Sequence, residues 1–425
     1  MKISKILFFT TISFLPLYII RGATIPTTFL EILIIFTTFI WLVERFFKKD
    51  FNLSDFKNQF NFLILLLFIV SLVELLFSLD IKGGLGILRA YFWEPFLVFY
   101  LTIWFIKREG AKFLMYAILA CSIIVSFVSV IQITTGYLAF APEELELGRA
   151  TSFFNSANAV GLLIGPIFVL IFPFLLQFKK DFFHFYSSFA IIISLVAILL
   201  TKSRGTYISL LSVLVLYFLI FLFRKFLTSK KALLTLTLFF AFIPIIIVFC
   251  FYILLFKFDL TPPVENAVYK GSDTLQIRFY LWEGTSKLIF DHPLFGAGLN
   301  GFKNLYSENY ILPQYTEPLQ YPHNFWLTIY SELGFFGVII FLVVYYICFK
   351  SIFNFFGKNG AKISDEKEFF NSFALPFGLL GALVYIQIHG LVDVPYFKND
   401  LACQFWILVG LVSTLGFSEN KKLFL

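Results

Sequence analysis

The sequence predicts an all-α polytopic membrane protein with about twelve transmembrane helices. Hydrophobic residues make up 59% of its 425 residues and charged residues only 14%, too few to cover the surface of a soluble protein of this size. The apolar residues form long uninterrupted runs instead of the alternating pattern of a strand or a barrel. The charged residues lie in short clusters between these runs, as loops between membrane spans require.

Each apolar run of roughly 18–25 residues predicts one span. The first run follows Lys2 and Lys5, a pattern that resembles a signal peptide and that we interpret as an uncleaved first helix. The predicted spans are residues 4–20, 27–43, 59–78, 86–106, 112–132, 158–178, 184–201, 206–223, 232–256, 324–349, 370–390 and 399–416.

The distribution of basic residues predicts the orientation. Most of the 33 Lys and Arg lie at the two termini and in one alternating set of loops. Because basic residues favour the cytoplasmic side, we expect both termini in the cytoplasm of an inner-membrane protein. The basic residues behind the net charge of +7 form no single patch, which argues against a nucleic-acid partner.

The sequence predicts three parts of the chain. They are residues 1–256 with helices one to nine, residues 257–323 as a large periplasmic loop with short helices, and residues 324–425 with helices ten to twelve.

The large loop contains its own helix signal. Ser272 and Asp273 can cap a helix through TLQIRFYLWEGTSKLIF, and His292-Pro293 then ends it. The loop is too short for a large independent domain, so we expect a partly helical lid over the bundle.

Seven ionisable residues within or at the ends of the predicted spans lie in the outer half or at the outer rim, and no span carries one deep in its cytoplasmic half, which predicts a polar cavity that opens outward. Arg89 and Glu94 are five residues apart and could form a local charge network. Glu31, Glu74 and Asp400, taken singly, are expected to snorkel or pair at the rim. The full set is Glu31, Glu74, Arg89, Glu94, Glu332, His389 and Asp400.

A glycine pattern in the lid invites a nucleotide-binding interpretation. Gly296, Gly298 and Gly301 match GxGxxG, but that fingerprint needs a strand before it, a helix after it and a parallel sheet. We therefore interpret these glycines as tight turns and close backbone packing. Gly334 and Gly337 are expected to be helix-packing positions.

Arg149, Arg204 and Arg278 lie on the side where basic residues are disfavoured. One such arginine alone could contact lipid headgroups. Three beside glycines and aromatic residues suit a multiply charged anion, because guanidinium stays protonated and can hold phosphate oxygens in a fork. His323 lies where the lid meets the membrane and could accept a proton, although a lone histidine is more often structural. No metal-ligand spacing is visible, so we expect no metal or other cofactor.

The outward side carries the motifs GRATSFFNSAN, TKSRG, RFYLW, DHPLFGAGLNGF, HNFWLTIYSELGFFG and HGLVDVPY. From about Arg149 to the end, the chain resembles the O-antigen ligase / O-antigen polymerase-like superfamily. The resemblance implies an architecture similar to C-type glycosyltransferases and metal-independent transfer of a glycan from undecaprenyl diphosphate to an acceptor hydroxyl. It also implies that Arg204 and Arg278 bind the carrier diphosphate and that His323 orients or deprotonates the acceptor. The supporting substrate-binding candidates are Arg149, Arg89, Trp282, Asn324 and Glu332.

Three functions stay open from the sequence. A ligase would attach the glycan to lipid A core or a similar surface acceptor, and a polymerase would extend the glycan on its carrier. A small-anion transporter would favour ionisable or broken-helix sites near mid-membrane and paired repeats, which the sequence does not show clearly. The expected partners are the undecaprenyl-diphosphate-linked glycan, a lipid A core or other glycan acceptor, and membrane lipids.

Overall fold

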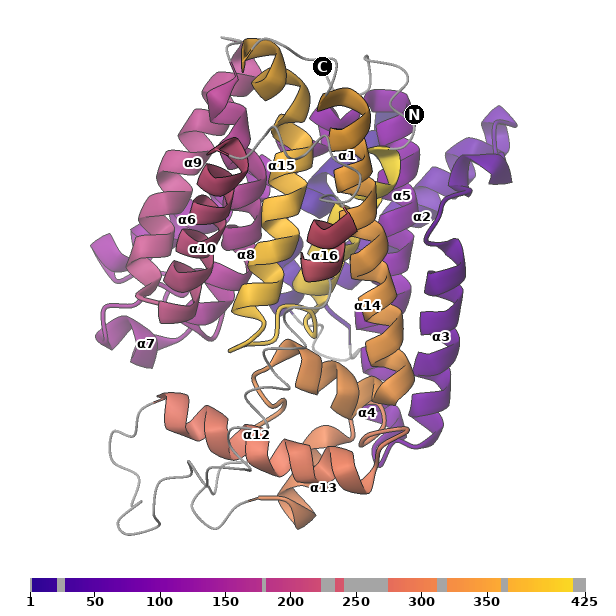
Figure 1. Cartoon of the computed structure of the whole chain (residues 1–425), viewed down its shortest axis with the longest axis vertical. Helices are drawn as coiled ribbons and strands as arrows, with labels where there is room; N and C mark the ends of the chain where they lie inside the picture. The colour runs from indigo at the N-terminus through magenta and orange to yellow at the C-terminus, as the bar shows by residue number, and fades with distance from the viewer. Residues whose placement is uncertain are drawn as a thin grey trace.

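The computed structural model shows a helical protein in which every regular element of the described part is a helix. Its long helices pack side by side into one body (Figure 1). The residues that the structure describes are 2–20, 27–177, 181–222, 234–240, 274–311, 319–360 and 366–415.

The helices of the first half follow the predicted spans closely, with short 3-10 or π turns between or beside them. They are α1 (Lys2–Ser13), η1 (Leu15–Ile19), α2 (Phe29–Lys48), η2 (Leu53–Phe56), α3 (Asn61–Leu76), α4 (Ile81–Leu88), the π-helical η3 (Arg89–Trp93), α5 (Glu94–Glu109), α6 (Ala111–Thr135), α7 (Pro142–Glu146), α8 (Ala157–Ile171), η4 (Phe172–Leu176), α9 (Phe182–Thr201) and α10 (Arg204–Leu222).

The second half adds two helices of the lid and three long helices. They are α12 (Thr274–Asp291), α13 (Phe302–Asn309), α14 (Phe325–Gly360), α15 (Glu366–His389) and α16 (Asn399–Thr414). The predicted ninth span, residues 232–256, lies mostly outside the described residues.

Several of these helices are long and apolar enough to cross a membrane, which confirms the prediction of a polytopic membrane protein. The total of twelve transmembrane helices stays a prediction. Shorter apolar helices cover Ile3–Ser13, Asn61–Leu76 and Arg204–Ile220. Within the described part, five helices are long and apolar enough: Ala111–Thr135, Ala157–Leu176, Phe182–Thr201, Phe325–Lys358 and Ser372–His389.

Basic side chains gather at the end of the body where α1 begins and where α2 and α5 end. Lys5 pairs with Glu109 at the end of α5. The guanidinium groups of Arg45 and Arg108 lie 4.7 and 4.2 Å from the ring of Trp104, where cation–π attraction stabilises them. This is the end that the charge distribution predicts to be cytoplasmic.

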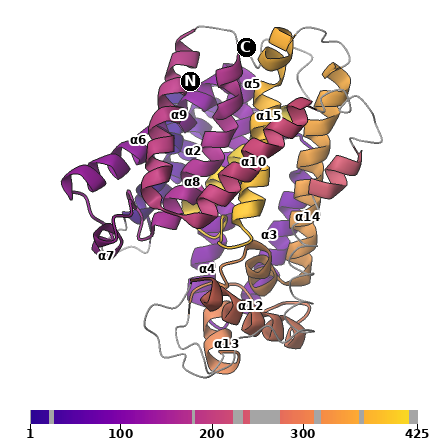
Figure 2. The same cartoon turned by 60° about the vertical axis from the view of Figure 1, so that its left-hand side comes forward.

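The lid helices lie at the other end of the body. Figures 1 and 2 show α12 and α13 together, beyond α4 and the beginning of α14. They share a small core of their own, formed by Tyr280, Leu281, Leu288, Ala297, Phe302 and Tyr306. The predicted lid helix is confirmed, since α12 ends at Asp291, directly before His292-Pro293. Its predicted caps, Ser272 and Asp273, lie outside the described residues.

The lid glycines allow close backbone packing, as predicted. Gly296 and Gly298 have φ angles of 59° and 73°, the left-handed region that favours glycine. A Cβ atom at Gly296 would lie 2.4 Å from the carbonyl oxygen of Tyr330, and one at Gly298 would lie 2.8 Å from that of Phe77. The loop between α12 and α13 therefore rests directly on the backbones of α3 and α14.

Gly334 is not the helix-packing position that the sequence predicted. Its φ of 61° breaks α14, and a Cβ atom there would lie 2.1 Å from the carbonyl oxygen of Leu294. The position is kept small by the approach of the lid loop, not by a neighbouring helix. For Gly337, the nearest atoms to an added Cβ belong to Leu333 of the same helix.

Candidate functional site

Two turns meet where the lid joins the body: residues 322–324, before α14, and residues 390–393, after α15. The Nδ1 atom of His323 lies 3.2 Å from Oδ1 of Asp393. The Asn324 side-chain amide donates to the carbonyl oxygen of Leu391 at 3.0 Å. These contacts fix the two turns to each other and orient the imidazole of His323.

Asp393 is 7% exposed and stays ionised. Burial raises the pKa of this carboxyl, but the hydrogen bond from His323 and the charges of His323, His389 and Lys398 outweigh burial and hold the pKa well below its usual range. A charged carboxylate beside Nδ1 keeps the proton of a neutral imidazole on that nitrogen, so Nε2 carries the basic lone pair.

The backbone of His323 is held in a sparsely populated conformation, with φ at 49°. Such a residue persists only where its surroundings fix it. One of the fixing contacts comes from the lid: the indole N–H of Trp282 donates to the carbonyl oxygen of Pro322 at 2.9 Å. Trp282 was predicted to bind substrate; in the structure its polar atom positions His323.

Arg278 lies one helical turn before Trp282 on α12. Its positive charge acts on the imidazole of His389, as does the negative charge of Asp393. Arg278, His389 and Asp393 therefore belong to one cluster at the end of α15 near the lid.

The TKSRG motif reaches the same cluster from another side. A Cβ atom at Gly205 would lie 3.0 Å from Nε2 of His389 and 3.2 Å from Cγ2 of Val392. Arg204 is exposed and is the first residue of α10. It directly precedes Gly205, which contacts the 389–393 segment. The structure brings the segments of Arg204, Arg278 and His323 together.

The other predicted substrate-binding residues have structural partners. The Asn324 side-chain oxygen accepts from the backbone N–H groups of Trp326 and Leu327 and caps α14. Glu332 is fully buried, and its carboxylate accepts from the backbone N–H groups of Asn300 at 2.5 Å and Phe302 at 3.4 Å. It anchors the beginning of α13, and substrate binding by either residue stays a prediction.

Arg149 is held by three partners. Its guanidinium donates to Glu144 at 2.7 Å, to the Asn158 side chain at 3.2 Å and to the carbonyl oxygen of Thr201 at 3.0 Å. These bonds fasten the GRATSFFNSAN segment to the end of α9, just before Arg204. Arg149 thus supports the beginning of α10 mechanically.

Arg89 is half-buried and lies in an ion network with two buried glutamates, which confirms the expected charge network with Glu94. It pairs with Glu31, and its Nε lies 3.4 Å from Glu94. The side chain of Asn399 donates to Glu31 at 2.6 Å. This network joins the beginnings of α2, α5 and α16.

The expectation that Glu31 snorkels or pairs is confirmed as pairing, since its carboxyl group pairs with Arg89. Glu74 and Asp400 do not snorkel, since each is 1% exposed. Glu31 and Glu94 are buried as well, at 3% and 2%, and the outward polar cavity stays a prediction. The hydropathy pattern gives depth along a helix but not the direction in which a side chain points.

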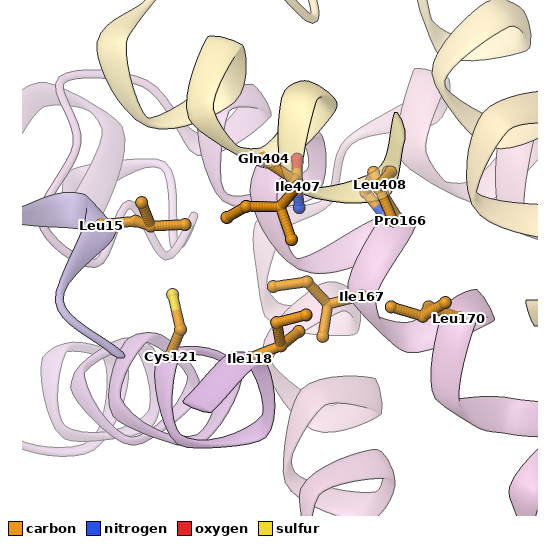
Figure 3. Close-up of a pocket in the computed structure, with 9 residues that line it drawn as sticks. All are labelled: Leu15, Ile118, Cys121, Pro166, Ile167, Leu170, Gln404, Ile407 and Leu408. Carbon is orange, nitrogen blue, oxygen red and sulfur yellow. The ribbon is translucent and has the colours of Figure 1, made fainter. Parts of the chain in front are cut away.

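One cavity of the described part lies deeper in the body and has apolar walls (Figure 3). It contains none of the predicted site residues. The side-chain amide of Gln404 at its edge donates to the carbonyl oxygen of Leu163 at 2.7 Å. Its lining is Leu15, Ile118, Cys121, Pro166, Ile167, Leu170, Gln404, Ile407 and Leu408.

His389 and Asp393 were not predicted as site residues, although the sequence analysis counted His389 among the ionisable residues of the spans. Both lie in the HGLVDVPY motif, where a histidine and an aspartate four residues apart precede a predicted span. That pairing of residue types in an outward loop was the available signal.

The fold and the site define a polytopic, all-helical membrane protein with an arginine–histidine cluster at the end opposite its basic end. Residues 189–342 match the family model described as O-Antigen ligase, which confirms the resemblance to the O-antigen ligase / O-antigen polymerase-like superfamily. The matched segment contains Arg204, Arg278 and His323 but ends before His389, and it is shorter than the range of the motifs. No curated protein is similar enough to match the chain.

Proposed function

We propose that this protein is a glycan ligase. It transfers a glycan from undecaprenyl diphosphate to a hydroxyl of lipid A core or a similar surface acceptor on the periplasmic side of the inner membrane. The observation that carries the proposal is the meeting of the His323–Asp393 pair with the segments of Arg204 and Arg278.

In this mechanism His323 is the general base. Its Nδ1–H is oriented by Asp393, and Nε2 takes the proton of the acceptor hydroxyl. The hydroxyl oxygen forms a bond to the anomeric carbon as the bond from that carbon to the diphosphate oxygen breaks. The diphosphate leaves with the electron pair, so the reaction needs no oxidant, reductant or activating nucleotide.

Arg204 and Arg278 neutralise the charge that develops on the leaving diphosphate. Preorganised charged donors at a leaving group are among the largest contributions to catalysis. Because guanidinium groups can supply this charge, we propose a metal-independent glycosyltransferase. The polymerase alternative uses the same donor site and differs in its acceptor.

The experiment compares glycolipids from cells that carry the intact protein, Arg278→Ala, His323→Ala or the control His292→Ala, which changes an exposed lid histidine. A ligase predicts that the first two variants lose glycan on the final acceptor while carrier-linked polymer accumulates. If single-repeat glycan still reaches the acceptor, the protein is the polymerase. Unchanged products from folded, membrane-inserted Arg278→Ala and His323→Ala would falsify the proposed roles.

The proposed topology has a separate test. With both termini cytoplasmic and the lid periplasmic, a cysteine introduced at the exposed position His292 should react with a membrane-impermeant maleimide in intact cells. Labelling only after the inner membrane is opened would place the lid in the cytosol and end the proposal.

A further inference from the structure

The segment that joins α2 to α3, residues 46–57, carries large apolar side chains on its surface. Four of them are between 49% and 79% exposed: Phe46, Phe47, Phe51 and Leu53. The end of α2 and the chain that leads into α3 project from the side of the body, at the end opposite the lid (Figure 1). Aromatic side chains at the end of a membrane helix typically lie at the level of the lipid headgroups, so this segment has the composition of a membrane-surface contact.

The backbone of this segment is held in one conformation. Lys49 caps the end of α2 in the left-handed region, with φ at 51°. The side-chain oxygen of Asn52 accepts from the N–H of Ser54 at 2.9 Å and caps η2. The ring of Phe56 packs edge-on against that of Trp41, with 5.8 Å between the ring centres. The exposed side chains therefore stand on a preformed support, and binding a partner orders little additional chain.

The acidic groups near this segment already have cationic partners. Arg45, which is buried, pairs with Glu44 and Asp50. Arg108 pairs with Asp55 at 2.8 Å. Because these pairs neutralise the carboxylates, the carboxylates do not offset the charge of further basic residues nearby.

Three lysines of the segment remain without a counter-charge. Lys48, Lys49 and Lys57 are exposed and form no ion pair with any residue that the structure describes. They lie within a few positions of the exposed phenyl rings in the chain, so a complementary ligand has an anionic group and a long apolar body. An anionic phospholipid has both. Basic residues beside a membrane helix attract the phosphates of an anionic leaflet, and lysine stems lie along apolar surface.

We propose that residues 46–57 form a binding surface for anionic phospholipid in the leaflet at the basic end of the body. The lysines contact the lipid phosphates, and the phenyl rings and Leu53 contact the acyl chains. The bound lipid fixes the depth of α2 and α3 in the bilayer. This surface lies at the end opposite the candidate site, so the inference does not rest on the proposed function.

The test measures hydrogen–deuterium exchange of the purified full chain in nanodiscs, read out by mass spectrometry. The N–H groups of Asp55 and Lys57 make the hydrogen bonds that close η2, so their exchange reports opening of the segment. An equal mixture of phosphatidylglycerol and phosphatidylcholine should slow this exchange by about tenfold relative to phosphatidylcholine alone, because bound lipid stabilises the closed segment. Inorganic diphosphate added to nanodiscs of phosphatidylcholine alone should leave the exchange unchanged.

The variants assign the effect to the segment. Lys48→Gln/Lys49→Gln should remove most of the slowing by phosphatidylglycerol, and Lys57→Gln, which leaves α2 unchanged, should remove part of it. The control Lys350→Gln/Lys358→Gln changes two exposed lysines of α14 and should keep the slowing of the native protein. Native exchange of α12 in each variant shows that the fold is retained.

Four outcomes would overturn the proposal. The first is equal exchange of the native segment in the two kinds of nanodisc. The second is full slowing in both Lys48→Gln/Lys49→Gln and Lys57→Gln, because these lysines then bind no lipid. The third is a control that loses the slowing as fully as Lys48→Gln/Lys49→Gln, because the total charge of this end is then responsible. The fourth is slowing by diphosphate alone, which would identify a soluble phosphate as the ligand.

Discussion

Gly205→Ala tests the site without changing any chemical group in it. The added Cβ atom would lie 3.0 Å from Nε2 and 3.1 Å from Cδ2 of His389, and 3.2 Å from Cγ2 of Val392. All three distances are shorter than ordinary van der Waals contact. The imidazole, the 389–393 turn or the first turn of α10 must therefore move by a few tenths of an ångström.

The change should reduce activity far more than stability. Overpacking of this kind typically destabilises by about 1–3 kcal/mol, and replacing a helical glycine with alanine recovers up to about 1 kcal/mol. The net loss of stability is then about 0–3 kcal/mol. Because small misplacements in an active site can reduce the rate by about 100-fold, we expect glycan transfer to fall by about 10- to 100-fold.

The assay measures glycan on the final acceptor in cells that express equal amounts of membrane-inserted protein. Gly86→Ala is the matched control, since Gly86 also lies in a helix, α4, but a Cβ atom there meets nothing within 4 Å. The control should transfer at the native rate and be equally stable or slightly more stable. Transfer by Gly205→Ala at half the native rate or more would refute the packing argument.

Three further predictions follow from the contacts of the site. Trp282→Phe keeps an aromatic ring but removes the indole N–H that fixes the backbone before His323. Glycan transfer should fall about tenfold with little change in thermal midpoint. Transfer at the native rate would mean that this hydrogen bond does not position His323. Asp393→Asn should lower the thermal midpoint at neutral pH. Because the pKa of Asp393 is lowered in the folded protein, its contribution to the free energy of unfolding is complete above the ordinary aspartate pKa of about 3.9 and is lost as the pH falls through the lowered pKa. The difference in thermal midpoint between Asp393→Asn and the native protein should therefore shrink in strong acid. A difference that widens there contradicts the linkage. Glu332→Gln replaces one of the two carboxyl oxygens that accept from backbone N–H groups by an amide donor and should destabilise by about 1–3 kcal/mol. The readout is faster proteolysis of the lid; unchanged proteolysis would show that the anchor is unimportant.

The positions of the helices were predictable because the bilayer imposes a length and a polarity on each span. The boundaries of α6, α9 and α16 lie within a few residues of the predicted ones. The His292-Pro293 signal was also sufficient to predict the end of α12. Interpretation failed at Gly334, because a single sequence does not show whether a loop or another helix will approach a glycine.

The site was predictable only in part. Arg204, Arg278 and His323 were singled out by residue type, by side of the membrane and by resemblance. His389 and Asp393 join them through contacts between segments far apart in the chain, such as the 3.2 Å contact across 70 positions between His323 and Asp393. Long-range pairing of this kind leaves no periodic signal in one sequence.

The arginines show why partners decide function more than position does. Arg149 and Arg89 each form an ion pair with a glutamate. A carboxylate on a guanidinium neutralises the charge and occupies donors that a phosphate would use. Arg278 acts on the imidazole of His389, as does Asp393, and the exposed Arg204 begins the helix that contacts the same imidazole through Gly205. Because Arg204 and Arg278 share the surroundings of the His323–Asp393 pair, they, and not Arg149 or Arg89, are the arginines to which we assign the diphosphate.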